Sequence, residues 1–339
     1  MPDLTQPNPL PQPEPPAPIV QEHAPPAPGY WFNLLLLVLT FFTTLVVGAH
    51  LQLSFNHNLP PLASAEDVLP LVHPQWFYQH PRLLLLGLPF SLTLMGILLA
   101  HEMGHYLSCR YYRVPATLPY FVPAPTLIGT LGAFIRIRGG MQSRAVLFDI
   151  GIAGPIAGFV AALPVLTYGL LHSRTVNVPV SADSIHLGFP MIFDLAWRLL
   201  RHGQPHVALR DIYLHPVTIA AWVGMFATSL NLLPGGQLDG GHIVYAWWPR
   251  GHKWISRLTI AALIPFGVFY WVGWLVWAVL LSLTGMRHPN VPGWPPLDQR
   301  RTRFALIALV LLALTLIPAP FIEGSGVDAV QSVLDGLRH

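Results

Sequence analysis

The stretch Leu83–His105 reads LLLLGLPFSLTLMGILLAHEMGH. Residues 83–100 carry no charged side chain, and about twenty apolar residues are enough to cross the hydrocarbon core of a bilayer. The run ends directly on His101, Glu102 and His105. Ionisable groups at the end of such a segment are costly in lipid, so their presence indicates a functional site.

The composition of the whole chain points to the same environment. Of its 339 residues, 53% are hydrophobic and 10% are charged, and the mean hydropathy is +0.51. Soluble domains carry roughly a quarter charged residues, so a large soluble domain and a wholly disordered chain are both excluded. The net charge of +3 and the lack of a basic run with interleaved aromatics speak against a nucleic-acid partner. Cys109 is the only cysteine, which excludes an internal disulfide.

Further apolar segments follow the same pattern as residues 83–100. Four of them are Trp31–Ala49, Ala145–Leu171, Val217–Leu233 and Phe304–Ile317. Between Leu258 and Met286 lies an uncharged stretch that is long for one span and short for two, because two spans need about 40 residues. The sequence therefore predicts an integral, multi-pass membrane protein with six or seven transmembrane helices.

The basic residues set the expected orientation. They gather after the second and fourth spans, at Arg110, Arg113, Arg136, Arg138, Arg144, Arg250, Lys253 and Arg257. The loop 52–82 holds only Arg82, although the loop 173–215 has four arginines. The positive-inside rule then places the N-terminus and the end of the second span in the cytosol. A hairpin of two spans in 258–286 would also place a later group of arginines in the cytosol: Arg287, Arg300, Arg301 and Arg303. The positive-inside rule favours this hairpin, whereas the length of the stretch opposes it. The side of the C-terminus stays open.

Three regions divide the chain. Residues 1–29 hold eleven prolines and no basic residue, which predicts a disordered, Pro-rich cytosolic tail and no signal peptide. A linker fits this composition better than a PxxP docking segment. Residues 30–320 form the expected membrane domain, with its core at about 83–250. Residues 321–339 are a short C-terminal tail.

The polar residues around His101 have the spacing of a metal site. Positions i and i+4 share one helix face, so His101 and His105 can both reach one metal, with Glu102 beside them as a general base. A third ligand is available in NLLPGGQLDGGH, residues 231–242, where the fourth span ends. Asp239 is either that ligand or the cap of the next helix, and pairing with the histidine motif favours the ligand. His242 is a weaker alternative, and Cys109 is expected only to pack.

These two motifs together resemble the site-2 protease family of intramembrane zinc metalloproteases. His101, Glu102 and His105 match its HExxH signature, and Asn231, Pro234, Asp239 and Gly240 match NxxPxxxxDG. The small-residue element Gly154–Gly158 resembles the family's third-span element, and Pro119–Phe134 resembles the branch with bacterial and plastid homologues. The likeness covers about 83–250 and extends more weakly to about 320.

The resemblance implies an all-α polytopic membrane metalloprotease with a three-helix catalytic core. His101, His105 and Asp239 would bind one zinc per chain, Glu102 would be the catalytic base, and Asn231 would hydrogen-bond the substrate backbone or the oxyanion. The substrates would be single-span membrane proteins cut within the bilayer. The expected location is a bacterial cytoplasmic membrane with a cytosolic active-site side. A homo-oligomer or an adaptor is left open.

Other segments carry secondary expectations. The prolines and β-branched residues of Pro119–Arg138 favour a membrane-associated β-hairpin that offers an edge to an extended substrate, and the alternative is a re-entrant loop that seals the site. Gly188–Arg201 suits a short amphipathic helix. Trp271, Trp274 and Trp277 are expected to be interfacial or lipid-facing. Two other functions remain alternatives: a membrane metal-binding or transport protein, and a non-catalytic homologue that binds membrane segments.

Overall fold

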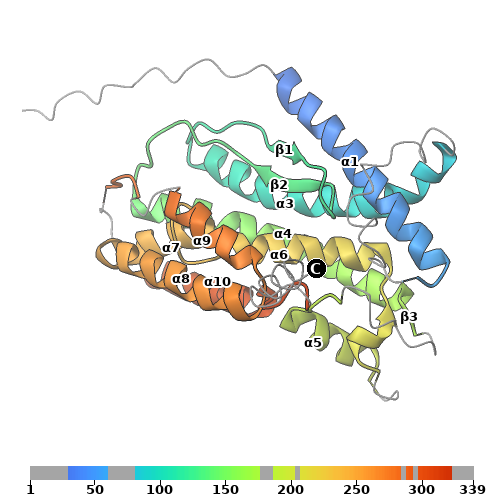
Figure 1. The fold of residues 1–339 in the computed structure, drawn as a ribbon. Coiled ribbons are helices and arrows are strands. Elements are labelled where there is room, and N and C mark those ends of the chain that lie inside the picture. The colour runs from blue at the N-terminus through green and yellow to red at the C-terminus, as the bar shows by residue number, and fades with distance from the viewer. Residues whose placement is uncertain are drawn as a thin grey trace, which may run out of the picture.

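The computed structural model describes residues 30–59, 81–175, 186–202, 207–283, 288–292 and 297–322 (Figure 1). The expected tails lie mostly outside these residues: all of 1–29, and 323–339 of the C-terminal segment. The described chain is mainly helical. In order, its elements are α1 (Tyr30–Asn56), η3 (Pro81–Gly87), α3 (Leu88–Tyr111), β1 (Tyr120–Pro123), β2 (Thr130–Phe134), α4 (Arg144–His172), β3 (Arg174–Thr175), α5 (Met191–Leu200), η4 (Leu209–Asp211), β4 (Ile212–Tyr213), α6 (Pro216–Asn231), α7 (Asp239–Trp247), α8 (Pro249–Phe269), α9 (Gly273–Leu283) and α10 (Gln299–Thr315).

Helices α3, α4 and α6 form the centre of the molecule and make extensive contacts with one another. Small residues let them approach closely. A Cβ on Gly104 of α3 would lie 2.5 Å from the carbonyl oxygen of Ala153 in α4. Among the described residues, three helices are long and apolar enough to cross a membrane: Tyr30–Asn56, Pro81–Tyr111 and Arg144–His172. The packed helices α3, α4 and α6 correspond to the three-helix core that the resemblance implies, although α6, with 16 residues, is not one of these three long helices.

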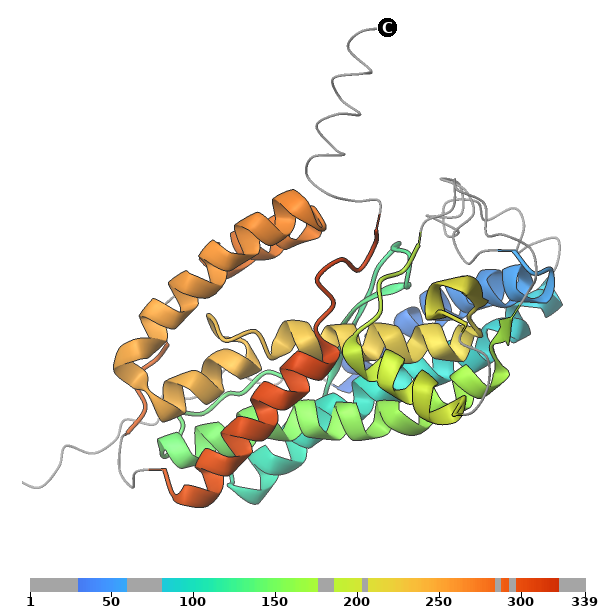
Figure 2. The ribbon, with the colours of Figure 1, turned by 90° about the horizontal axis from the view of Figure 1, so that it is seen from below.

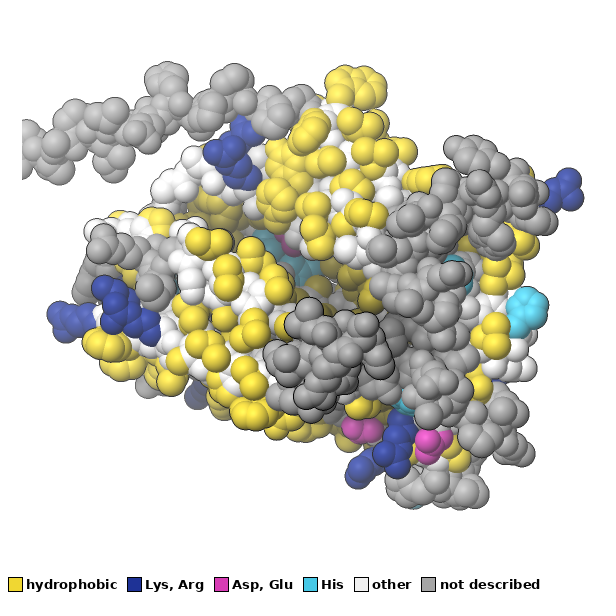
Figure 3. Space-filling view, in the orientation of Figure 1, with side chains coloured by type: hydrophobic (Ala, Val, Ile, Leu, Met, Phe, Trp, Pro, Cys, Tyr) yellow, Lys and Arg dark blue, Asp and Glu magenta, His cyan; other side chains and the backbone are white. Residues whose placement is uncertain are grey.

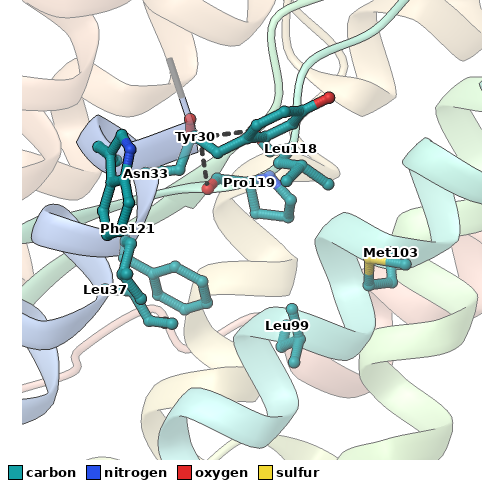
Figure 4. Close-up of a pocket in the computed structure, with 10 residues that line it drawn as sticks. Tyr30, Asn33, Leu37, Leu99, Met103, Leu118, Pro119 and Phe121 are labelled. Carbon is teal, nitrogen blue, oxygen red and sulfur yellow. Dashed lines mark hydrogen bonds between the residues drawn. The ribbon is translucent and has the colours of Figure 1, made fainter. Parts of the chain in front are cut away.

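The segment after α3 forms the expected β-hairpin. Strands β1 and β2 pair antiparallel, with Tyr120 opposite Phe134 and an irregularity between Phe121 and Pro123. The hairpin is attached to α1 by Asn33, whose amide Nδ2 donates to the carbonyls of Leu118 and Pro119 at 3.1 and 3.0 Å (Figure 4). The hairpin lies over α3 in Figure 1, so it stands next to the HExxH helix.

The described part of the stretch 258–286, up to Leu283, belongs to a helical hairpin, and this hairpin begins earlier than the sequence suggests. Helix α8 starts at Pro249, so Arg250, Lys253 and Arg257 lie within its first turns, and it packs against α9 after a turn at 270–272 (Figure 2). The nine additional residues give α8 a length of 21 residues, about that of a span, whereas the described α9 has eleven. The basic side chains conceal the start of the helix in the sequence, because an uncharged run begins only at Leu258.

Two further features complete the frame of the site. Helix α10 packs on α4, and Arg301 in its first turn pairs with Asp149 near the start of α4, so α10 begins on the side where α3 ends. The expectation for Trp274 was wrong: it is fully buried, and its indole Nε1 donates to the carbonyl of Pro318 at 2.7 Å. The amphipathic helix expected at 188–201 is present as α5.

Candidate metal centre

The three predicted ligands meet in the structure although they come from two distant parts of the chain. The Nε2 atoms of His101 and His105 are 3.2 Å apart, and each lies 3.2 Å from Oδ2 of Asp239. Two imidazole nitrogens and one carboxylate oxygen form a donor set typical of catalytic zinc. A regular tetrahedron with edges of this length has its centre about 2.0 Å from each corner, which is the usual zinc–nitrogen distance. The residues therefore fit a zinc ion.

The neighbouring helices hold these ligands in place. His105 donates from Nδ1 to the carbonyl of Ile150 in α4 at 2.8 Å, which leaves the lone pair of Nε2 directed at the other two ligands. A Cβ on Gly154 would lie 2.1 Å from Nε2 of His105, and one on Gly158 would lie 3.0 Å from Nδ1 of His101. The two glycines of α4 thus make the space in which both imidazoles stand.

Asp239 opens α7 but does not cap it. The N-cap residue is Leu238, and Asp239 is the first residue of the helix. Its carboxylate faces the two histidines instead of the free backbone amides of its own helix. The capping interpretation of Asp239 is thereby set aside.

Glu102 and Asn231 lie beside the ligands. Both line a small pocket of about 80 Å³, together with His101, Thr228 of α6, residues 131–133 of the hairpin and Trp277 of α9. The side chain of Glu102 is 5% exposed, and the backbone of Ile135, just beyond β2, hydrogen-bonds to it. Nδ2 of Asn231 lies 3.3 Å from Nε2 of His101. In Figure 3, histidine and acidic side chains are visible at the bottom of a hollow between apolar surfaces.

The two weaker ligand candidates stand elsewhere. His242 is hydrogen-bonded through Nδ1 to Nε2 of His288 at 2.8 Å, and it is not one of the three converging ligands. Cys109 is fully buried in an apolar cluster with Val114, Val146 and Ile150, as its expected packing role requires.

Comparison with known proteins adds to this geometry. The family model of Peptidase family M50 matches residues 89–273, which include every motif of the site. The chain belongs to peptidase family M50. It is also 32% identical to "Probable zinc metalloprotease EGY1, chloroplastic" of Oryza sativa over 89% of its length and 53% of that protein. It is 31% identical to "Probable zinc metalloprotease EGY2, chloroplastic" of Arabidopsis thaliana over 79% of its length and 47% of that protein. The chain spans about half the length of these curated relatives, and no solved structure matches it.

One supporting cluster of this M50 chain was not anticipated from the sequence. Asp149 of α4 accepts hydrogen bonds from the Tyr112 hydroxyl at 2.5 Å and from Nε and Nη2 of Arg301 at 2.9 and 2.5 Å. Burial and the adjacent carboxylate raise the pKa of Tyr112, so its hydroxyl stays protonated and donates. Asp149 precedes Ile150, whose carbonyl orients His105. The cluster thus ties the ends of α3, α4 and α10 together next to a metal ligand.

Proposed function

We propose that this chain is an intramembrane zinc endopeptidase that hydrolyses peptide bonds in or near transmembrane segments of other proteins. The observation that carries the proposal is the equal spacing of His101, His105 and Asp239 beside a buried Glu102. Three protein ligands leave a fourth position open, which distinguishes a catalytic zinc site from a closed structural one.

Each residue of the site has a definable task. His101, His105 and Asp239 would hold a zinc ion, which when bound would supply a Lewis acid and an activated water at neutral pH. Glu102 takes the proton of the attacking water on its carboxylate and passes it to the leaving amine nitrogen. The amide of Asn231 donates to the carbonyl oxygen of the scissile bond, where negative charge develops. Ile150 keeps His105 in the required tautomer through its carbonyl.

The β-hairpin is the proposed docking edge for the substrate. Residues 131–133 of β2 line the same pocket as Glu102, while β1 occupies the other edge of β2. A transmembrane helix has its backbone hydrogen bonds internally satisfied, so it must unwind before cleavage. An extended segment added to β2 recovers those hydrogen bonds on the protein and places its backbone along the pocket.

We further propose a topology with the active-site side in the cytosol of a bacterium and α8 and α9 as a re-crossing hairpin, which gives seven spans. The pairing of Arg301 with Asp149 supports it, because both ends of the segment 249–299 then lie on one side. The relatives named above are chloroplastic, so the membrane itself is part of the proposal. Reporter fusions after residues 202 and 292 in a bacterial host test the sides directly.

The decisive experiment compares the wild-type chain with Glu102→Ala against a panel of tagged single-span proteins. We expect the wild type to cut at least one of them and the variant to lose at least about a hundredfold in rate. Zinc content, measured by mass spectrometry of the purified chain, should stay near one per chain in both. If Glu102→Ala cuts at the wild-type rate, the proposed mechanism is wrong.

The transport alternative is tested with the same proteins. A transporter moves zinc across liposomes, and that flux should not depend on Glu102. Apolar residues such as Ile97, Leu98 and Ala227 also line the pocket, which favours a closed reaction site over a conduction path. A non-catalytic homologue would bind the single-span proteins and leave them uncut.

A further inference from the structure

One face of helix α8 packs against the loop 232–238, which connects Asn231 to the proposed metal ligand Asp239. His252, Ser256 and Thr259 on this face are 2%, 0% and 9% exposed. His252 Nε2 lies 3.1 Å from the carbonyl oxygen of Gly236, Ser256 accepts from the amide of Gly236 at 3.2 Å, and Thr259 donates to the carbonyl of Pro234 at 3.2 Å. These contacts fix the backbone between Asn231 and Asp239.

The opposite face of α8 is basic and aromatic. Arg250, Lys253, Trp254 and Arg257 recur at the spacing of one helix face, and all four are exposed. Trp254 is 68% exposed, and the guanidinium of Arg257 lies 5.1 Å from the centre of its ring. Among the described residues, no carboxylate pairs with the three cations of this face, whereas Arg301 is bonded to two acids.

In the topology proposed above, the position of α8 brings this face to the membrane surface on the active-site side. Nη1 of Arg144, the first residue of α4, lies 3.5 Å from the carbonyl of Ala246 at the end of α7, just before α8 begins. The exposed Trp247 ends α7, and the exposed Trp248 joins α7 to α8. Basic side chains gather near the α7–α8 end of the molecule in Figure 3. Tryptophan and arginine at such a helix end are typical of the headgroup region.

We propose that Arg250, Lys253, Trp254 and Arg257 form a binding site for the headgroup of an anionic phospholipid, and that its occupancy steadies the metal loop held by the other face of α8. Lysine and arginine bind the phosphate, and arginine does so with two parallel N–H groups. A net negative lipid is favoured over a zwitterionic one because the face carries three unneutralised positive charges. Coupling to the metal follows because the cations and the loop contacts lie within about three turns of one helix, residues 250–259.

Lipid binding by the purified full chain is tested with phosphatidylglycerol and phosphatidylcholine, counted by native mass spectrometry at low salt. Each basic side chain near an anionic surface contributes about fivefold. We therefore expect at least about a tenfold preference for phosphatidylglycerol, reduced to less than about twofold in the triple variant Arg250→Gln/Lys253→Gln/Arg257→Gln. Inorganic phosphate at equal ionic strength should not compete better than chloride, which separates a lipid headgroup from a free anion.

A matched control removes the same charge from the same side of the membrane. Arg110, Arg113 and Arg303 are exposed and lie outside α8, and their triple change to glutamine should keep the preference. Equal loss in both triple variants, or no preference in the wild type, overturns the binding site. Zinc loss to a chelator tests the coupling: phosphatidylglycerol should slow it severalfold in the wild type and not in the α8 variant. Equal rates in both lipids overturn the coupling, independently of any proteolytic activity.

Discussion

The two sides of α3 differ sharply although they belong to the same turns of one helix. One side carries His101 and His105 and borders the small pocket of about 80 Å³ that Glu102 and Asn231 also line. The other carries Leu99 and Met103 and borders an almost wholly apolar pocket of about 500 Å³ between α1, α3 and the entry to the hairpin (Figure 4).

The difference lies in the support that each side needs. The histidines on the metal side have polar partners on other elements: Ile150 for His105, Asp239 for both histidines, and Asn231 near His101. The apolar side has no such requirement, because apolar groups carry no hydrogen-bonding demand. Substitutions on the metal side should therefore act through lost partners, and those on the apolar side only through lost packing.

The largest expected difference in zinc affinity is between a substitution of a ligand on the metal side of α3 and a substitution of a nearby residue on the apolar side. His105→Ala should lower zinc affinity by more than the about 10–100-fold caused by losing an outer partner. Met103→Ala should leave zinc content at one per chain, because Met103 faces the apolar pocket. Zinc titration against a competing chelator measures both. Loss of zinc in Met103→Ala would contradict the separation of the two sides.

The next largest difference in zinc content is expected between alanine substitutions at two glycines, Gly154 and Gly96. Gly154→Ala places a methyl group 2.1 Å from Nε2 of His105, so the imidazole must leave its position and zinc should be lost. Gly96→Ala in α3 meets nothing within 4 Å. It should retain zinc and gain up to about 1 kcal/mol of helix stability. The measurements are zinc content and thermal unfolding in detergent, and a zinc-replete Gly154→Ala would refute the steric argument.

The sequence predicted the metal side of α3 well, and it predicted the residues around that side less well. The i, i+4 spacing of His101 and His105 predicts their proximity, because a helix places both on one face. Asp239 was predicted to join them because its span ends on the same side of the membrane as α3. Asp149 and Arg301 are 152 residues apart, and no local pattern announces such a pair. The prediction that Trp274 is interfacial or lipid-facing was wrong for a similar reason: tertiary packing, which the local sequence does not show, decides whether a tryptophan in an apolar helix contacts lipid or protein.

The cluster around Asp149 provides an intermediate test. Asp149→Asn weakens the bonds to Arg301 and Tyr112 and should lower stability by about 1–3 kcal/mol, less than for a fully buried pair because both side chains are partly exposed. Zinc affinity should fall about tenfold, since Ile150 orients His105. Asp211→Asn, whose partner Arg210 is 74% exposed, is the control and should change stability by less than about 1 kcal/mol. Unchanged zinc affinity in Asp149→Asn would show that the cluster only stabilises the fold.

The smallest expected effect on zinc binding lies at the rim of the apolar pocket, where the amide of Asn33 is polar. Asn33→Ala leaves the carbonyls of Leu118 and Pro119 without their donor, which should cost about 1–3 kcal/mol of stability. Asn56→Ala at the exposed end of α1 should stay within about 0.5 kcal/mol. Zinc content should be unchanged in both, because Asn33 touches the hairpin and not the ligands. If Asn33→Ala also slows cleavage of a single-span substrate at constant zinc content, the effect reaches the site through the position of β2. If cleavage is unaffected, the anchoring of β1 to α1 serves stability alone, and the two sides of α3 are independent.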